Sequence, residues 1–197
     1  MNTVLKWSLC FVFVFWGCQE VFVPKPRGYF KIDFPKKEYL VFDRPDYPYS
    51  FEYPTYAIVV KDSTFFGDPT ENPWWINIDF PQFNGRIYVS YKTLSNSQQF
   101  TKVLQDAFKL TSKHTTKAYS IDDSLFRNNQ GVSGLFFKVG GDVATANQFF
   151  LTDSTKHFLR GALYFDATPN EDSLSVVNRF LLEDMRHLIQ TFRWKGN

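Results

Sequence analysis

The sequence predicts an α+β domain in which an antiparallel β-sheet packs against two main helices. Short β-rich runs bounded by turn residues recur between residues 49 and 165. Residues 97–114 and 172–194 instead repeat apolar side chains every three or four positions, as helices do. The runs follow one another as hairpins, which favours an antiparallel sheet. With 197 residues, 44% of them hydrophobic and 19% aromatic, the chain can build one substantial core.

The N-terminal segment has the pattern of a secretory signal. Lys6 precedes an uncharged apolar run at 7–16, which is too short to cross a hydrocarbon core of about 30 Å comfortably. The run ends in Gly17-Cys18, as bacterial lipoprotein signals do. We therefore expect residues 1–17 to be a lipoprotein signal peptide, and the Cys18 thiol to carry lipid. Acyl groups such as palmitate would then hold the protein on a membrane.

The cysteine count fits this interpretation. Of the two cysteines, Cys10 would leave with the signal and Cys18 would be capped, so the mature domain would have no disulfide. Phe15 and Trp16 stand where the usual consensus has leucine and a small residue. Two alternatives are a retained N-terminal anchor and a buried strand.

Residues 18–46 are expected to form an extended tether. From Gln19 to Pro54 the sequence holds six of the ten prolines, at 24, 26, 35, 45, 48 and 54, and proline blocks helix formation. The many aromatic residues between them predict that this tether becomes an edge segment lying on the domain. The globular domain is placed at 47–197.

The first half of this domain reads as strands. Runs at 49–53, 56–60, 74–80 and 86–92 are rich in β-branched and aromatic residues, and the last two alternate in character. Asn84-Gly85 between them favours the positive φ values of a tight turn, which predicts a hairpin.

The second half alternates between helix and sheet. Ser97 is the predicted cap of the first helix, and Asp172 or Ser173 of the last. Strands are predicted at 117–121, 131–141, 143–151 and 156–165, the last two forming a hairpin around "TDST". "YSFEYP" near the start and a long last helix ending in "TFRW" make the layout similar to the Mog1/PsbP/DcrB-like fold.

Composition and motifs argue against several functions. A formal charge of +2 gives no basic field for nucleic acid, and no glycine-rich nucleotide loop occurs. No two histidines have metal-site spacing, so no metal or cofactor is expected. His187 follows Glu183 by four residues on the last helix, which predicts an ordinary side-chain pair.

Residues 153–160 resemble catalytic chemistry most. They hold Asp153, Ser154, His157 and Arg160, but no nucleophile elbow surrounds Ser154. His157 and Arg160 should also point to opposite faces of a strand. No catalytic residue is therefore predicted.

The same hairpin and a pair of tryptophans are candidates for binding instead. Trp74 and Trp75 are either core and edge cover or an exposed platform for a glycan or protein. Together with Asp153, His157 and Arg160 they make a candidate surface for a partner or ligand. An envelope enzyme or a glycan or ligand binder that uses these residues is the alternative function.

Several long blocks resemble one family. They are "PKPRGYFKIDFPKKEY", "YPYSFEYPTYA", "WWINIDFPQFNGRIYVSYK", "QFFLTDSTKHFLRGALYF" and "PNEDSL", behind a signal ending in Cys18. This pattern is similar to the gliding motility-associated lipoprotein GldD family. The resemblance implies a non-enzymatic, envelope-located lipoprotein facing the periplasm. It would act with gliding machinery proteins that are linked to type IX secretion, and Cys18 is the only functional position that the resemblance carries over.

Overall fold

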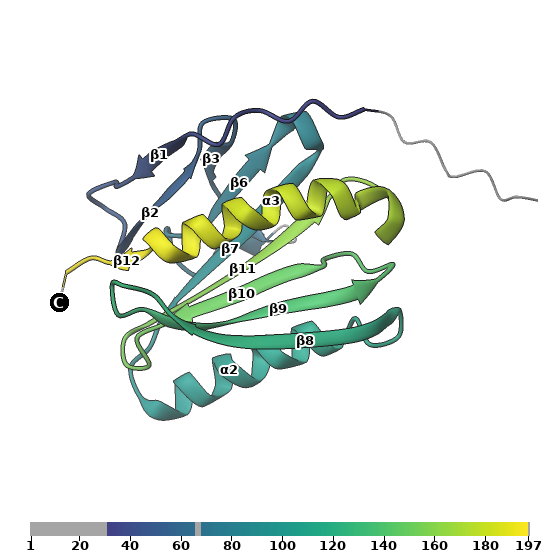
Figure 1. Cartoon of the computed structure of the whole chain (residues 1–197). Helices are drawn as coiled ribbons and strands as arrows, with labels where there is room; N and C mark the ends of the chain where they lie inside the picture. The colour runs from purple at the N-terminus through teal and green to yellow at the C-terminus, as the bar shows by residue number, and fades with distance from the viewer. Residues whose placement is uncertain (1–30, 66–67, 197) are drawn as a thin grey trace, which may run out of the picture. The chain divides into compact units, whose positions relative to one another are not determined.

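The computed structural model describes residues 31–65 and 68–196 (Figure 1). The chain divides into two units, 1–34 and 35–197, and every element below lies in the second. In chain order these are β1 (Tyr39–Phe42), β2 (Tyr49–Pro54), β3 (Ile58–Lys61), β4 (Thr64–Phe65), β5 (Asp68–Pro69), β6 (Ile76–Phe80), the 3₁₀ turn η2 (Pro81–Phe83), β7 (Gly85–Thr93), α2 (Ser97–Ser112), β8 (Ala118–Arg127), β9 (Ser133–Gly141), β10 (Asn147–Thr152), β11 (His157–Phe165), α3 (Glu171–Thr191) and β12 (Arg193–Trp194).

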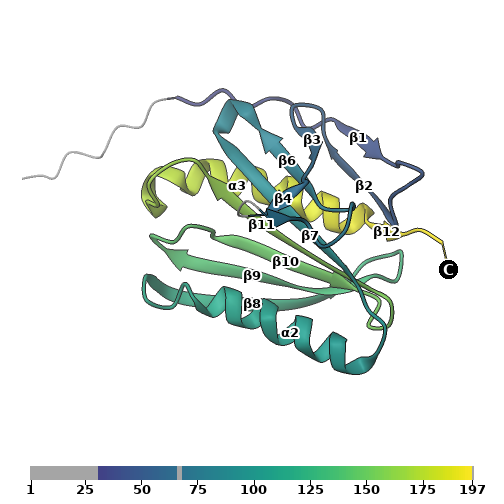
Figure 2. The ribbon, with the colours of Figure 1, turned by 180° about the vertical axis from the view of Figure 1, so that it is seen from behind.

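A seven-stranded antiparallel sheet dominates this unit, with the strand order β3-β6-β7-β11-β10-β9-β8. Helix α3 lies on one face of the sheet and α2 on the other (Figures 1 and 2). A smaller sheet, β1-β2-β12, packs beside α3 through β2, and β4 pairs with β5. The predicted α+β class, an antiparallel sheet with two main helices, is confirmed.

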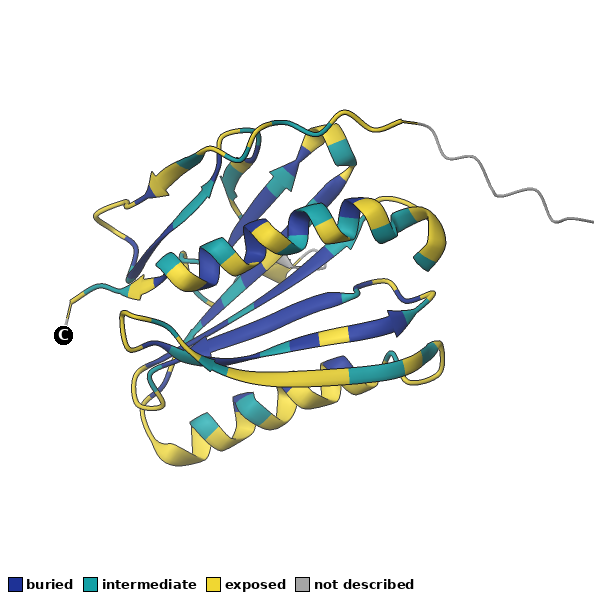
Figure 3. Ribbon diagram, in the orientation of Figure 1, coloured by how far each residue is buried: buried dark blue, intermediate teal, exposed yellow. Residues whose placement is uncertain are grey.

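The main core lies between α3 and the sheet. The side of α3 that faces the strands is buried (Figure 3), and Leu181 and Met185 are fully enclosed there. The predicted alternation in β6 places Ile76, Ile78 and Phe80 in this core. Asn77 on the opposite face is buried too, because that face is also partly covered.

The β6–β7 hairpin is confirmed, although its turn differs from the predicted one. Phe80 pairs with Gly85, and Pro81–Phe83 form a short 3₁₀ turn between the strands. Only Asn84 takes a left-handed conformation, with φ of 47°. Gly85 is already the first residue of β7, so only half of the predicted Asn-Gly pair supplies a positive φ.

Both helix caps differ from those predicted. The side chains of Asn96 and Asn170 each accept a backbone N–H three residues further on, at 2.9 and 2.8 Å. The prediction that Ser97 caps the first helix and that Asp172 or Ser173 caps the last was therefore wrong. The reason is that a cap needs an extended backbone just before the first helical residue, and Asn96 and Asn170 have φ of −161° and −152°.

Two segments carry more strand than the sequence indicates. The strand predicted at 117–121 extends to Arg127 as β8, the exposed edge of the large sheet. Within the segment 18–46, Tyr39–Phe42 form β1 and pair with β2. Residues from Pro35 onward belong to the same compact unit as the sheet.

Candidate functional site

The five residues of the predicted partner or ligand surface lie in three different places. Trp75 and Arg160 line a groove on the α2 side of the sheet. Trp74 and His157 join an aromatic cluster around Tyr91, and Asp153 organises the β10–β11 turn. The structure therefore brings together two of the five side chains at a cavity.

Asp153 has a structural explanation within its turn. Its Oδ1 accepts backbone N–H groups from Thr155, Lys156 and His157 at 2.9–3.0 Å. Burial alone would raise the pKa of Asp153, but these hydrogen bonds hold it below its ordinary value. Ser154 is exposed and has a φ of 63°. The four residues 153–156 thus form a turn that fixes the register of the hairpin.

His157 is a core residue. Its Nδ1 lies 2.6 Å from the Tyr91 hydroxyl, and its ring stacks on Trp194 at 4.8 Å. Burial lowers the pKa of His157, so the imidazole is neutral at pH 7. Its side chain lies on the opposite face of β11 from Arg160, as the period of two predicts.

The two tryptophans also separate. Trp74 donates its indole N–H to the Asp46 carbonyl at 2.7 Å and packs edge-on against Tyr91 at 5.4 Å. Trp75 donates its indole N–H to the Tyr91 carbonyl at 2.9 Å, and its ring lines the groove. Both residues precede β6, and because Trp74 packs on Tyr91 while Trp75 lines the groove, the two rings do not form one platform.

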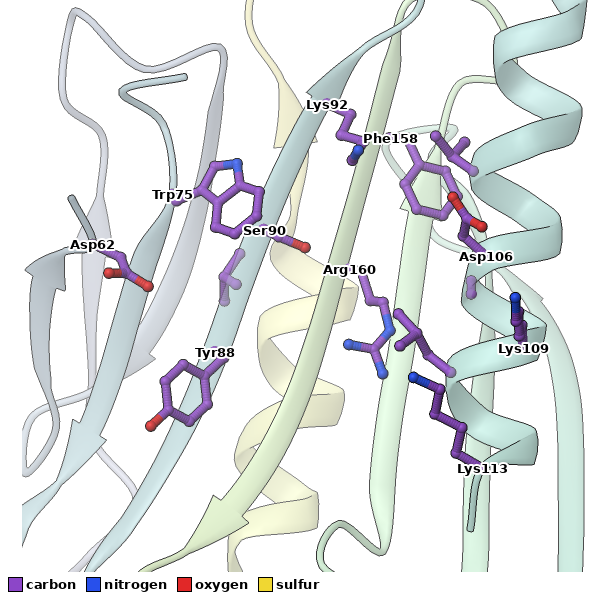
Figure 4. A pocket seen from close by; sticks show the side chains of 14 residues that line it. Asp62, Trp75, Tyr88, Ser90, Lys92, Asp106, Lys109, Lys113, Phe158 and Arg160 are labelled. Atoms are coloured by element: carbon purple, nitrogen blue, oxygen red, sulfur yellow. The ribbon is translucent and has the colours of Figure 1, made fainter. Parts of the chain in front are cut away.

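The groove lies between α2 and strands β7 and β11, with Trp75 entering it from just before β6 (Figure 4). Helix α2 packs over β9–β11 and leaves the adjoining face of β7 open, which creates a cavity of about 390 Å³. The apolar part of its lining is Trp75, Tyr88, Val89, Val103, Ala107, Leu110 and Phe158. The polar part is Asp62, Ser90, Lys92, Asp106, Lys109, Lys113 and Arg160.

Positive charge gathers in this groove where β11 faces the C-terminal end of α2. The half-buried Arg160 donates to Gln148 Oε1 at 2.5 Å, and no carboxylate among the described residues forms an ion pair with it. Lys113 extends from α2 toward the guanidinium (Figure 4). Lys92 is paired with Glu71 at 2.9 Å. Sequence reasoning missed Lys113, because α2 and β11 meet only in the fold.

A second polar cluster joins the N-terminal segment of this unit to α3. Lys37 Nζ lies 2.8 Å from Asp184, donates to the Phe180 carbonyl at 2.7 Å, and sits 3.5 Å from the centre of the Phe180 ring. Tyr39 and Tyr56 also donate to Asp184. Asp184 is thus a buried carboxylate with three donors from two other segments of the chain.

His187 takes part in the same contact region. Its Nε2 lies 2.6 Å from Glu52, and its ring stacks on Tyr39 at 3.6 Å. The predicted pair with Glu183 was wrong, since Glu183 instead lies 4.0 Å from Lys37. Strand β2 brings Glu52 beside α3 across 135 residues of sequence, so helical spacing could not reveal it.

Two further observations bear on the class of protein. Within residues 31–65 and 68–196, no helix is long and apolar enough to cross a membrane. No group of three or more potential metal ligands occurs in the part of the chain that the structure describes. The predicted lipid attachment point, Cys18, and the signal peptide at 1–17 lie outside the described residues.

Fold and site define an α+β domain with a cationic, partly apolar groove. Comparison with family models assigns the chain more narrowly: it belongs to the family described as gliding motility lipoprotein GldD, whose model matches residues 19–194. Membership in a lipoprotein family points to membrane anchoring in the cell envelope.

Among solved structures, the cyanobacterial PsbP protein CyanoP from Synechocystis sp. PCC 6803 is similar at 13% identity. That match covers 87% of this chain and 99% of the other, with a TM-score of 0.47. A comparison with curated proteins finds no match.

Proposed function

We propose that this protein is a non-enzymatic accessory component of the bacterial gliding machinery, anchored to a membrane by lipid on Cys18. The observation that carries the proposal is the family match, which begins at residue 19, directly after that cysteine. The partners would be other gliding proteins and the linked type IX secretion apparatus.

In this proposal the protein acts by tethering. The 17 residues from Cys18 to Phe34 span at most roughly 60 Å when fully extended. A lipid at Cys18 would therefore confine the domain to a thin layer beside the membrane and raise its effective concentration near partners. The contacts of Lys37 and Tyr39 with α3 fix the place where the tether joins the domain.

The geometry at residues 153–160 supports a non-enzymatic role. A Ser–His pair needs the hydroxyl within about 3 Å of the imidazole. Here the Ser154 backbone sits in the exposed turn, while His157 Nδ1 is engaged by Tyr91 in the core. For Ser154 and His157 to act as a catalytic pair, the β10–β11 hairpin would have to change its conformation.

A Cys18→Ser variant tests the proposal, with Cys10→Ser as its matched control. Cells fed a clickable palmitate analogue should label the wild type and Cys10→Ser but not Cys18→Ser. The Cys18→Ser protein should move to the soluble periplasmic fraction, and gliding should be lost. A Cys18→Ser protein that stays on the membrane and supports gliding would contradict tethering.

Crosslinking in native membranes tests the assignment to a machine. Purification of the lipidated protein should co-isolate gliding or secretion proteins, and the yield should fall for Cys18→Ser. A lipidated protein that copurifies with none of them would argue for the envelope enzyme or binder instead.

A further inference from the structure

We propose that the groove between α2 and β7/β11 binds a small amphipathic anion, with a carboxylate or phosphate head on an apolar body. The volume, about 390 Å³, falls in the range of small-molecule sites. Such sites combine mostly apolar walls with a few convergent polar groups, and this groove has both.

The head group is defined by Arg160. The guanidinium is held in place by Gln148 Oε1, an uncharged acceptor that leaves its charge uncompensated. Burial lowers the pKa of Arg160, while Tyr164 raises it. A half-buried guanidinium without a carboxylate partner is unusual, because its desolvation destabilises the fold. A planar carboxylate or a phosphate could bind this guanidinium through paired hydrogen bonds.

Neighbouring lysines reinforce this preference. Lys113 points toward Arg160 from α2, and Lys109 lies one turn earlier on the same helix (Figure 4). Two cations that converge without an anion between them repel one another, and a bound anion would reverse that repulsion. The carboxylates of Asp62 and Asp106 also line the groove and exclude highly charged anions.

The apolar body is defined by the rest of the lining. Tyr88 on β7, Phe158 on β11 and Trp75 just before β6 supply aromatic surface. Val103 and Leu110 supply aliphatic surface from α2. Leu110 lines the groove and is 39% exposed. An apolar ligand would cover this surface.

Matched probes separate the two parts of the proposal. The purified protein is titrated with 2-naphthyl phosphate and 2-naphthoate, with neutral 2-naphthylmethanol, and with inorganic phosphate, while backbone amide NMR shifts are recorded. The two naphthyl anions should shift residues of β7, β11 and α2 and bind at least tenfold more tightly than the neutral or the bodiless probe. Equal binding of 2-naphthylmethanol or of inorganic phosphate would overturn the proposal, as would the absence of binding by both anions.

Variants locate the site. Lys113→Met should weaken 2-naphthyl phosphate binding about three- to tenfold, whereas Lys102→Met, an exposed lysine of the same helix outside the groove, should leave it unchanged. Arg160→Met should weaken it by on the order of tenfold or more. If Arg160→Met unfolds the protein, the comparison of Lys113→Met with Lys102→Met still tests the proposal. Equal effects of the two lysine variants would overturn the proposal. Tight binding of an acidic peptide, together with no tight binding of the small anions, would also overturn it.

Discussion

Lys37 and Asp184 form an ion pair at 2.8 Å, although they lie 147 positions apart in the sequence and the Asp184 side chain is only 1% exposed. Asp184 lies on the side of α3 that meets the N-terminal part of this unit, and Tyr39 and Tyr56 complete its hydrogen bonds. Because an unpaired buried carboxylate is strongly destabilising, Lys37 should be worth far more than a surface lysine. The pair joins the segment that follows the tether to the last helix.

Replacing Lys37 with methionine should destabilise the domain by about 2–4 kcal/mol, because Asp184 loses its cation while it stays buried. Urea unfolding measures the change in the free energy of unfolding. The adjacent exposed Lys36, changed to methionine, should alter this free energy by less than about 0.5 kcal/mol. Equal stability of the two variants would show that the ion pair contributes nothing.

His157 should make the fold less stable in mild acid. Burial lowers the pKa of His157 in the folded state. Below about pH 6.5 the imidazole is therefore protonated in the unfolded chain while it is still neutral in the folded protein. Stability should therefore fall between pH 7 and pH 5, by at most roughly 2 kcal/mol for this group. His114 contributes in the same direction, since burial lowers its pKa too.

The measurement compares unfolding at pH 7 and pH 5 for the wild type and His157→Gln. The variant should be less stable at pH 7, and its loss between the two pH values should be smaller. Asp153 does not disturb the comparison, because a carboxyl with a lowered pKa loses its contribution only near and below pH 4. An unchanged pH dependence in the variant would contradict this explanation.

Gly161 should not tolerate a side chain. It pairs with Phe149 on β10, and a Cβ added there would lie 2.3 Å from the Phe149 ring. Gly161→Ala should therefore destabilise the protein by about 1–3 kcal/mol through overpacking. Combining it with Phe149→Leu should cost less than the sum of the two single changes, as a double-mutant cycle in urea would show. Strict additivity would mean that the ring does not cause the effect.

The helix caps give a prediction that separates neighbouring residues. Asn170→Ala should cost about 1 kcal/mol, because its side chain caps α3. Ser173→Ala should cost much less, since Ser173 contributes its backbone N–H to that bond. The same contrast is expected between Asn96 and Ser97 at α2. Thermal unfolding of the four variants measures these differences, and a larger loss from either serine would contradict the assignment.

Local patterns predicted the elements well where burial follows a simple period. The alternation along 74–80 and 86–92 placed β6 and β7, because one face of each strand meets the α3 core. The edge strand β8 was underestimated because it is mostly exposed, and Asp122 and Asp123 break the alternation without penalty at an edge.

The candidate site was harder to predict, because its parts come from distant segments. Trp75 and Arg160 stood out as residue types, but the groove between them exists only because α2 leaves β7 partly uncovered. Likewise, no local pattern links Glu52 to His187. Sequence therefore indicated which side chains carry chemistry, while the strand order decided which of them meet.

The contacts of Lys37 also determine how the domain would respond to mechanical force. A pull transmitted through the residues before Pro35 would reach the Lys37–Asp184 ion pair before the β1–β2 ladder. Tension on a membrane tether would thus be delivered to the middle of α3, before it reaches the large sheet. If the protein is tethered as proposed, this ion pair would carry load before the strands of the large sheet do.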